Sequence, residues 1–207
     1  MALGTFIASQ LRKPTGWFGK IVVARVLNRA NGPMNELTLR ELELAPDDRV
    51  LEIGFGGGDL ISRMVRVVTR GRIAGADFSP EMTAFCAKRF AALVRAGVVE
   101  LRCASVDALP YPSGEFTKAC AVNAIYFWPD PAAALCELRR VLRDGGRLAV
   151  TFNPRATAEK LPYTRHGFRH FEADEVRRLL EDSGFRGART VEGSTGLGPF
   201  VCAIGVK

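Results

Sequence analysis

The sequence of 207 residues has few of the side chains that build metal or disulfide sites. It contains only two histidines, and its five cysteines occur singly, without a C-x-x-C pair. A disulfide framework and a structural zinc site therefore have no support, and we expect free, buried thiols. The histidines also lack the nearby carboxylates of a metal site, so no metal is expected. The cysteines are Cys86, Cys103, Cys120, Cys136 and Cys202.

Long apolar runs and concentrated basic motifs are also missing. No run approaches the roughly 18 residues of a membrane span. The first residues, MALGTFIASQLRKP, lack the basic start and apolar length of a secretory signal, so we expect a cytoplasmic protein. The net charge is +7, yet Lys and Arg are spread along the expected helices, which makes nucleic acid an unlikely partner. Peripheral contact with an anionic membrane is compatible with this charge, and nothing specifies an oligomeric state.

The most informative stretch that is present is VLEIGFGGGD, residues 50–59. Its apolar residues predict a buried strand, and the glycines after it allow a sharp turn and close approach of a ligand. A helical apolar pattern follows over residues 60–69. A nucleotide-like ligand would therefore meet free backbone N–H groups at the start of a helix.

Two acidic residues narrow the choice of nucleotide. The dinucleotide fingerprint GxGxxG needs Gly or Ala at position 59, where this chain has Asp59, whose carboxylate would repel a pyrophosphate. A nicotinamide oxidoreductase is therefore the disfavoured rival class. Residues 72–76 predict a second strand that ends at Asp77, about twenty residues past the glycines, where an acid can accept both ribose hydroxyls.

VLEIGFGGGD, followed by GADFSPEM, resembles the S-adenosylmethionine site of class I methyltransferases, especially the group that includes the ubiquinone and menaquinone biosynthetic enzymes. The turn RDGGR at residues 143–147 adds to this resemblance, which covers the chain from Arg49 onward. It implies a Rossmann-like, doubly wound α/β fold with seven strands, mostly parallel with the last strand antiparallel, and helices on both faces. Residues 1–45 would form a helical cap segment, and residues 46–207 the cofactor-binding domain.

The resemblance also implies roles for individual residues. Glu52, which as an unpaired buried carboxylate needs a partner, would hold the amino acid end of the cofactor; its alternative partner is backbone or an Arg. Met82 would touch the adenine or belong to the core, and either Ser105 or Asp107 would meet the adenine amino group. The expected cofactor-binding set is Glu52, Gly54, Gly56, Gly58, Asp77, Phe78, Met82, Ser105, Val106, Asp107 and Asn123.

The loop 123–130 follows the fourth predicted strand, 116–122, at the edge of the sheet where ligands bind. Its aromatic residues can wall an apolar substrate and face the sulfonium, or they can pack the next helix. Tyr126 and His166 are the candidates for a general base, with His170 as the other histidine. Direct displacement of a methyl group needs a base only for a hydroxyl acceptor.

The remaining pattern predicts the other elements of the fold. Expected helices span residues 17–30, 33–44, 80–96, 131–142 and 172–182, and expected strands span 98–103, 148–152, 186–191 and 200–206. The function implied by the resemblance is methyl transfer from S-adenosylmethionine to a small acceptor, with S-adenosylhomocysteine as product. The alternatives are methylation of a membrane lipid or quinone, and a non-catalytic cofactor-binding module. The sequence does not choose among O-, N- and C-methylation.

Overall fold

The computed structural model describes residues 31–161, 164 and 168–207. Its seven strands form a sheet in the order β3-β2-β1-β4-β5-β7-β6, so the predicted fold class is confirmed. The strands are β1 (Arg49–Ile53), β2 (Arg72–Asp77), β3 (Val99–Cys103), β4 (Phe116–Val122), β5 (Leu142–Phe152), β6 (Arg186–Thr195) and β7 (Gly198–Val206). The α-helices are α3 (Gly32–Leu42), α4 (Asp59–Met64), α5 (Pro80–Arg89), α6 (Ala91–Arg95), α7 (Pro131–Val141), α8 (Arg155–Ala158) and α9 (Ala173–Asp182), and a 3-10 turn, η1, covers Ile125–Phe127.

The direction of the strands explains where a ligand can bind. β1 pairs in parallel with β2 on one side and with β4 on the other. The connections therefore run outward in opposite directions from β1 and β4, and a crevice opens between their carboxyl ends. β7 alone runs antiparallel to its neighbours β5 and β6.

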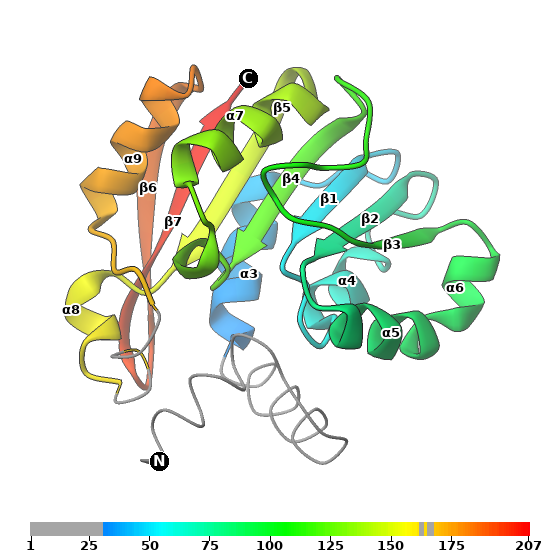
Figure 1. Cartoon of the computed structure of the whole chain (residues 1–207), viewed down its shortest axis with the longest axis horizontal. Helices are drawn as coiled ribbons and strands as arrows, with labels where there is room; N and C mark the ends of the chain where they lie inside the picture. The colour runs from blue at the N-terminus through cyan, green and yellow to red at the C-terminus, as the bar shows by residue number, and fades with distance from the viewer. Residues whose placement is uncertain (1–30, 162–163, 165–167) are drawn as a thin grey trace.

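Helices cover both faces of the sheet because its inner strands are apolar on both sides. The core of one face packs β1 and β4 residues such as Leu51 and Ala121 against α7 and α9. The opposite core packs the alternate residues, such as Val50 and Cys120, against α3, α4 and α5. Figure 1 shows α7 and α9 in front of the sheet and α3 behind it. Among the described residues, no helix is long and apolar enough to cross a membrane.

The predicted elements differ from the structure mainly in where helices and strands begin and end. The helix expected over 80–96 is divided at Phe90, whose φ of −104° separates α5 from α6. The helix expected over 60–69 ends at Met64, because the chain turns there. β5 begins at Leu142, so the turn expected at residues 143–147 lies within it, contrary to the prediction. β6 and β7 are also longer than predicted, since their pairing continues to Thr195 and Gly198. The helix expected over 17–30 lies outside the described residues.

The prediction of five buried thiols is partly wrong. Cys86, Cys120 and Cys202 are buried, whereas Cys103 and Cys136 are exposed. Cys103 is the last residue of β3, an edge strand, and Cys136 lies on the solvent side of α7. Apolar neighbours in sequence do not bury a side chain at such positions. All five thiols are free.

Candidate functional site

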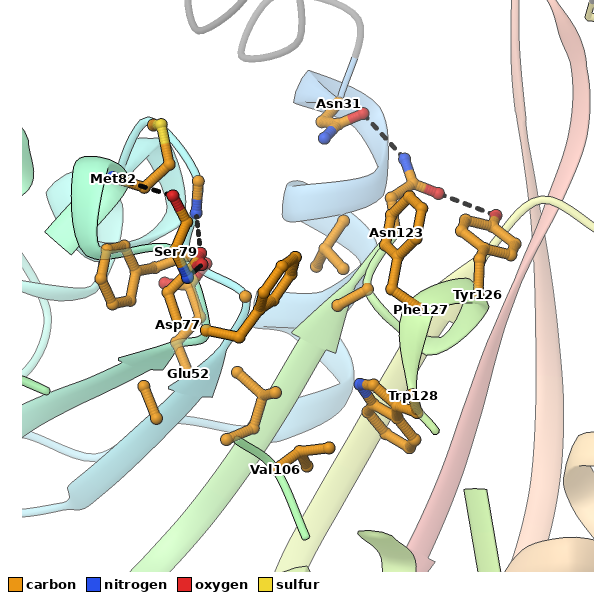
Figure 2. A pocket seen from close by; sticks show the side chains of 18 of the residues that line it. Asn31, Glu52, Asp77, Ser79, Met82, Val106, Asn123, Tyr126, Phe127 and Trp128 are labelled. Carbon is orange, nitrogen blue, oxygen red and sulfur yellow. Dashed lines mark hydrogen bonds between the residues drawn. The ribbon is translucent and has the colours of Figure 1, made fainter. Parts of the chain in front are cut away.

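A cavity of about 310 Å³ lies at the carboxyl ends of β1, β2 and β4. Its walls come from the start of α3, the glycine turn after β1, the ends of β2 and β4, and segments following β3 and β5. Figure 2 shows side chains from these separate segments converging on one space. The cavity therefore occupies the crevice that the reversal of strand order creates.

The glycine turn after β1 lines this cavity, and its backbone conformation requires glycine. Gly54 has a φ of +69°, and a Cβ there would lie 2.7 Å from the Cβ of Ala124. Gly54 and Gly56 line the cavity, as does Gly57. Gly58 does not; it precedes α4 with a φ of +75°, and a Cβ there would lie 2.5 Å from the Phe90 ring. The structure thus gives Gly58 a packing role against α5.

Glu52 lines the cavity with only 4% of its surface exposed. Burial, together with the nearby Asp77 and Asp59, raises the pKa of its carboxyl to about 8. Its Oε2 has no hydrogen-bond partner among the described residues. A buried acid with a free oxygen is costly unless a donor or cation arrives. The site therefore favours a ligand that carries a positive group.

Asp77 lies at the end of β2 and organises the turn around it. Its carboxylate accepts the backbone N–H of Gly56 (3.2 Å) and that of Ser79 (2.9 Å). Burial raises the pKa of Asp77, and these two hydrogen bonds partly oppose the rise. Ser79 in turn caps α5 by accepting the N–H of Met82. One acid thereby fixes the glycine turn and the start of α5.

Of the remaining residues predicted to bind the cofactor, some line the cavity and one does not. Phe78 and Met82 line the cavity, with Phe78 45% exposed and Met82 buried. Ser105 and Val106 also line it. Asp107 is exposed and does not line the cavity, so of the two candidates for the adenine amino group only Ser105 is placed at the site.

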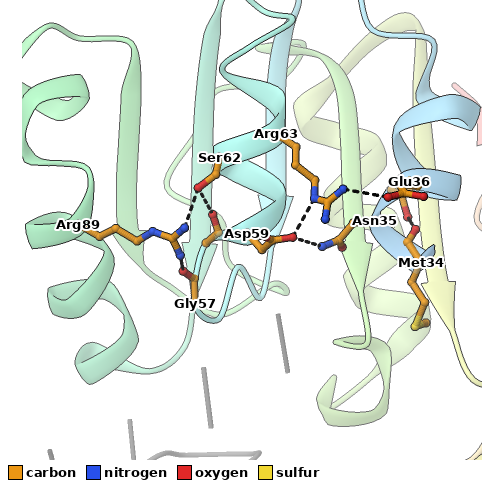
Figure 3. Close-up of polar contacts among 10 residues, drawn as sticks. Met34, Asn35, Glu36, Gly57, Asp59, Ser62, Arg63 and Arg89 are labelled. Atoms are coloured by element: carbon orange, nitrogen blue, oxygen red, sulfur yellow. Dashed lines mark hydrogen bonds and ion pairs between the residues drawn. The ribbon is translucent and has the colours of Figure 1, made fainter. Parts of the chain in front are cut away.

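Asp59, which argued against a dinucleotide, lies in a polar network at the start of α4. Its Oδ2 accepts a hydrogen bond from Asn35 of α3 (2.9 Å) and forms an ion pair with Arg63 (2.8 Å), as Figure 3 shows. On the other side of the turn, Arg89 donates to the Gly57 carbonyl and to Ser62. These contacts hold the glycine turn from both neighbouring helices.

A second network holds the end of β4. Asn123 has a φ of +54°, and its Nδ2 donates to Oδ1 of Asn31 (2.9 Å). The Tyr126 hydroxyl donates to Oδ1 of Asn123 (2.9 Å) and accepts the backbone N–H of Asn153 (2.5 Å). All four residues line the cavity, and Figure 2 shows the chain from Asn31 through Asn123 to Tyr126. The Tyr126 proton is thus engaged by Asn123.

An aromatic wall lies beside this network. The Phe127 and Phe168 rings meet at a centroid distance of 4.7 Å, and Tyr126 packs against both. With Trp128 they line the cavity. The irregular segment after the fifth strand is placed by sequence where it can cap the pocket, but Phe168 within it was not singled out as a site residue.

The histidines contribute little to the described part of the cavity. His166 lies outside the described residues. His170 Nε2 contacts the carbonyl of Thr164 (3.1 Å), and His170 does not line the cavity. In the described ranges, no group of three or more His, Cys, Asp or Glu side chains is placed to hold a metal ion.

Three asparagines of the cavity, Asn31, Asn35 and Asn153, were not predicted from sequence. Asn31 and Asn35 belong to a helix that precedes the glycine turn by about twenty residues, and no motif spacing connects them to it. Asn153 follows β5 as Asn123 follows β4, so its position at a strand end is the signal that could have found it.

Comparison with known proteins identifies this arrangement. A family model described as a methyltransferase domain matches residues 51–150. The uncharacterized methyltransferase YdaC of Bacillus subtilis (strain 168) is 27% identical over 162 residues, covering 78% of this chain and 87% of YdaC. The demethylmenaquinone methyltransferase of Thermus thermophilus is 36% identical over 111 residues, covering 53% of this chain and 48% of that enzyme.

Among solved structures, a SAM-dependent methyltransferase from Aquifex aeolicus superposes with a TM-score of 0.72 and 21% identity, covering 90% of this chain and 98% of the other. That likeness shows the fold. The chain spans most of YdaC but about half the length of the Thermus enzyme. The family match, the relatives and the sheet order together identify residues 51–150 as part of a methyltransferase domain of the class I SAM-dependent type, whose cofactor is S-adenosylmethionine, with distant homology to the menaquinone methyltransferases.

Proposed function

We propose that this protein transfers the methyl group of S-adenosylmethionine to a small, mainly apolar acceptor by direct displacement. The observation that carries the proposal is the division of one cavity into two chemically different halves. Glycines and the acids Glu52 and Asp77 lie at the ends of β1 and β2. Aromatic and amide side chains, including Phe127 and Phe168, lie beyond the end of β4. The first half suits the cofactor, and the second suits an apolar acceptor.

In this mechanism the chain mainly positions the reactants. S-adenosylmethionine would supply a methyl group on a positively charged sulfur: the acceptor would form a bond to the methyl carbon, the carbon–sulfur bond would break, and S-adenosylhomocysteine would leave. The aromatic wall excludes water and orients the acceptor, and its ring faces favour a neighbouring positive charge. The Tyr126 hydroxyl already donates to Asn123, which fits a reaction that needs no proton removal before attack, as with an amine or an activated carbon. The base role predicted for Tyr126 or His166 stays a prediction for a hydroxyl acceptor.

Calorimetric titration with S-adenosylmethionine, S-adenosylhomocysteine and NADH tests the cofactor. We expect micromolar binding of the first two and none of NADH. Asp77→Ala should abolish binding, because it removes the ribose partner and frees the N–H groups of Gly56 and Ser79. Asp47→Ala, at an exposed turn residue outside the cavity, is the matched control and should bind normally. Unchanged affinity in Asp77→Ala would refute the site.

Turnover separates an enzyme from a non-catalytic binding module. Purified protein and S-adenosylmethionine with a labelled methyl group should be screened against panels of aromatic amines, phenols, quinols and prenylated compounds. Transfer of label to an apolar acceptor is the expected result. Binding without transfer to any class would instead support the binding module.

A second candidate is methylation of a membrane-borne lipid or quinone. Residues 1–30 contain five basic and no acidic residues, so most of the net charge of +7 lies there, beside many apolar residues. This segment joins the described chain at Asn31, which lines the cavity. Co-sedimentation with anionic but not with neutral vesicles would support this candidate, because basic residues near an anionic surface each contribute about 1 kcal/mol.

A further inference from the structure

The start of α3 carries two asparagines, Asn31 and Asn35, that both line the cavity. They are four residues apart, which places them on one face of the helix. Asn31 contacts Asn123 of the acceptor half, and Asn35 contacts Asp59 beside the glycine turn. One turn of helix therefore spans both halves of the site.

Hydrogen bonds fix which end of each carboxamide remains available. Asn35 donates its Nδ2 to Asp59, and a carboxylate can only accept, so the Asn35 Oδ1 is left as a free acceptor. Asn35 as a residue is only 3% exposed, it lines the cavity, and its Oδ1 has no hydrogen bond to another described residue. Its Oδ1 is not among the fully buried unpartnered atoms of the described residues, so a donor from a ligand in the cavity can approach it.

The orientation of Asn31 is the opposite. Its Oδ1 accepts from Asn123 Nδ2, and the oxygen of Asn123 faces the Tyr126 hydroxyl and Asn153 Nδ2. The Asn31 Nδ2 has no hydrogen bond to another described residue, and Figure 2 shows it on the side away from Asn123. Asn31 precedes α3 at the N-cap position but makes no side-chain capping bond to the helix. The N–H groups and the positive end of α3 near it also favour an anion.

We propose that Asn31 and Asn35 recognise the amino acid end of S-adenosylmethionine, with Asn31 Nδ2 donating to its carboxylate and Asn35 Oδ1 accepting from its ammonium. The inference rests on the cofactor assignment above. A free donor and a free acceptor on one helix face match a group that carries one anion and one cation on the same carbon. Glu52, whose ionised form a neighbouring cation would favour, and Asp59 line the same cavity.

The test uses ligands that lack one or both charged groups. Decarboxylated S-adenosylmethionine keeps the ammonium but has no carboxylate, and 5′-methylthioadenosine has neither. Asn31→Asp keeps an oxygen for Asn123 but places a negative charge where the donor was. We expect it to weaken S-adenosylmethionine binding about 10- to 100-fold, the range for a hydrogen bond to a charged group, without weakening the decarboxylated ligand.

Asn35→Ala should weaken both S-adenosylmethionine and its decarboxylated form, because both carry the ammonium. In both variants 5′-methylthioadenosine should bind as it does to the unaltered protein, which excludes a general loss of structure. Equal loss of all three ligands, or of the decarboxylated ligand in Asn31→Asp, would overturn the inference while leaving the cofactor assignment intact. Failure of the unaltered protein to bind S-adenosylmethionine would overturn both.

Discussion

The hydroxyl of Tyr126 joins the end of β4 to the end of β5. It accepts the backbone N–H of Asn153 and donates to Asn123, so we expect it to position the end of β4. Tyr126→Phe keeps the ring but leaves these two groups unpaired, which should lower the free energy of unfolding by about 1–3 kcal/mol. Denaturant titration measures this loss.

The matched control is Tyr111→Phe, because the Tyr111 hydroxyl is buried without a partner among the described residues and lies outside the cavity. That variant should be at least as stable as the unaltered protein. With an acceptor from the labelled-methyl screen, Tyr126→Phe should also keep the shape of the pH–rate profile. Loss of a basic limb in that profile would show that Tyr126 is a general base instead.

Site residues could be predicted from sequence where they belong to a short motif of consecutive residues. Gly54, Gly56 and Asp77 belong to a strand–turn–helix unit and its neighbouring strand, and the backbone requirement appears in the residue types. Ser105 and Asp107 could not be separated, because both lie in the short loop after β3 and only the folded structure shows which of them lines the cavity. The resemblance implied a helical cap segment that includes Asn31 and Asn35, but no motif singled out these two residues, since their place depends on how α3 crosses the sheet.

At the scale of elements, the contact between the glycine turn and the end of α5 limits which side chain position 58 can carry. Gly58 and Gly97 both have positive φ, +75° and +71°, but a Cβ would strike the Phe90 ring only at Gly58. Gly97→Ala should cost about 1–2 kcal/mol from the left-handed backbone alone. Gly58→Ala should cost about 1–3 kcal/mol more, from overpacking. Equal losses in urea unfolding would contradict the packing role of Gly58.

The same contact explains which element boundaries the sequence could not predict. Strands β1, β2 and β4 were placed within about a residue, because short apolar runs bounded by turns define buried parallel strands. The division of the 80–96 helix at Phe90 has no such pattern. At this division the ring of Phe90 lies against Gly58, thirty-two residues earlier, and such a tertiary contact leaves no local sequence pattern.

For the whole molecule, the buried Glu52 predicts how stability depends on pH. Its pKa is raised from 4.5 to about 8 in the folded protein, so the folded state holds a proton that the unfolded state releases over this range. Stability must then fall as pH rises from about 4.5 to 8, by at most about 5 kcal/mol from this group. Burial also raises the pKa of Asp77, so this group too lowers the stability of the protein as the pH rises. Glu52→Gln should flatten the slope between pH 5 and 8.

The affinity for the cofactor should have the opposite pH dependence to the stability of the free protein. A cationic ligand near Glu52 favours its ionised form, so binding of S-adenosylmethionine below pH 8 should release a proton, and affinity should rise with pH. At pH 7, where the ligand's ammonium is already protonated, the calorimetric binding enthalpy should vary with the ionisation enthalpy of the buffer. Glu52→Gln, which has no proton to release, should show little variation at this pH. A buffer-independent enthalpy for the unaltered protein at pH 7 would mean that Glu52 keeps its proton in the complex and acts as a hydrogen-bond donor to the ligand.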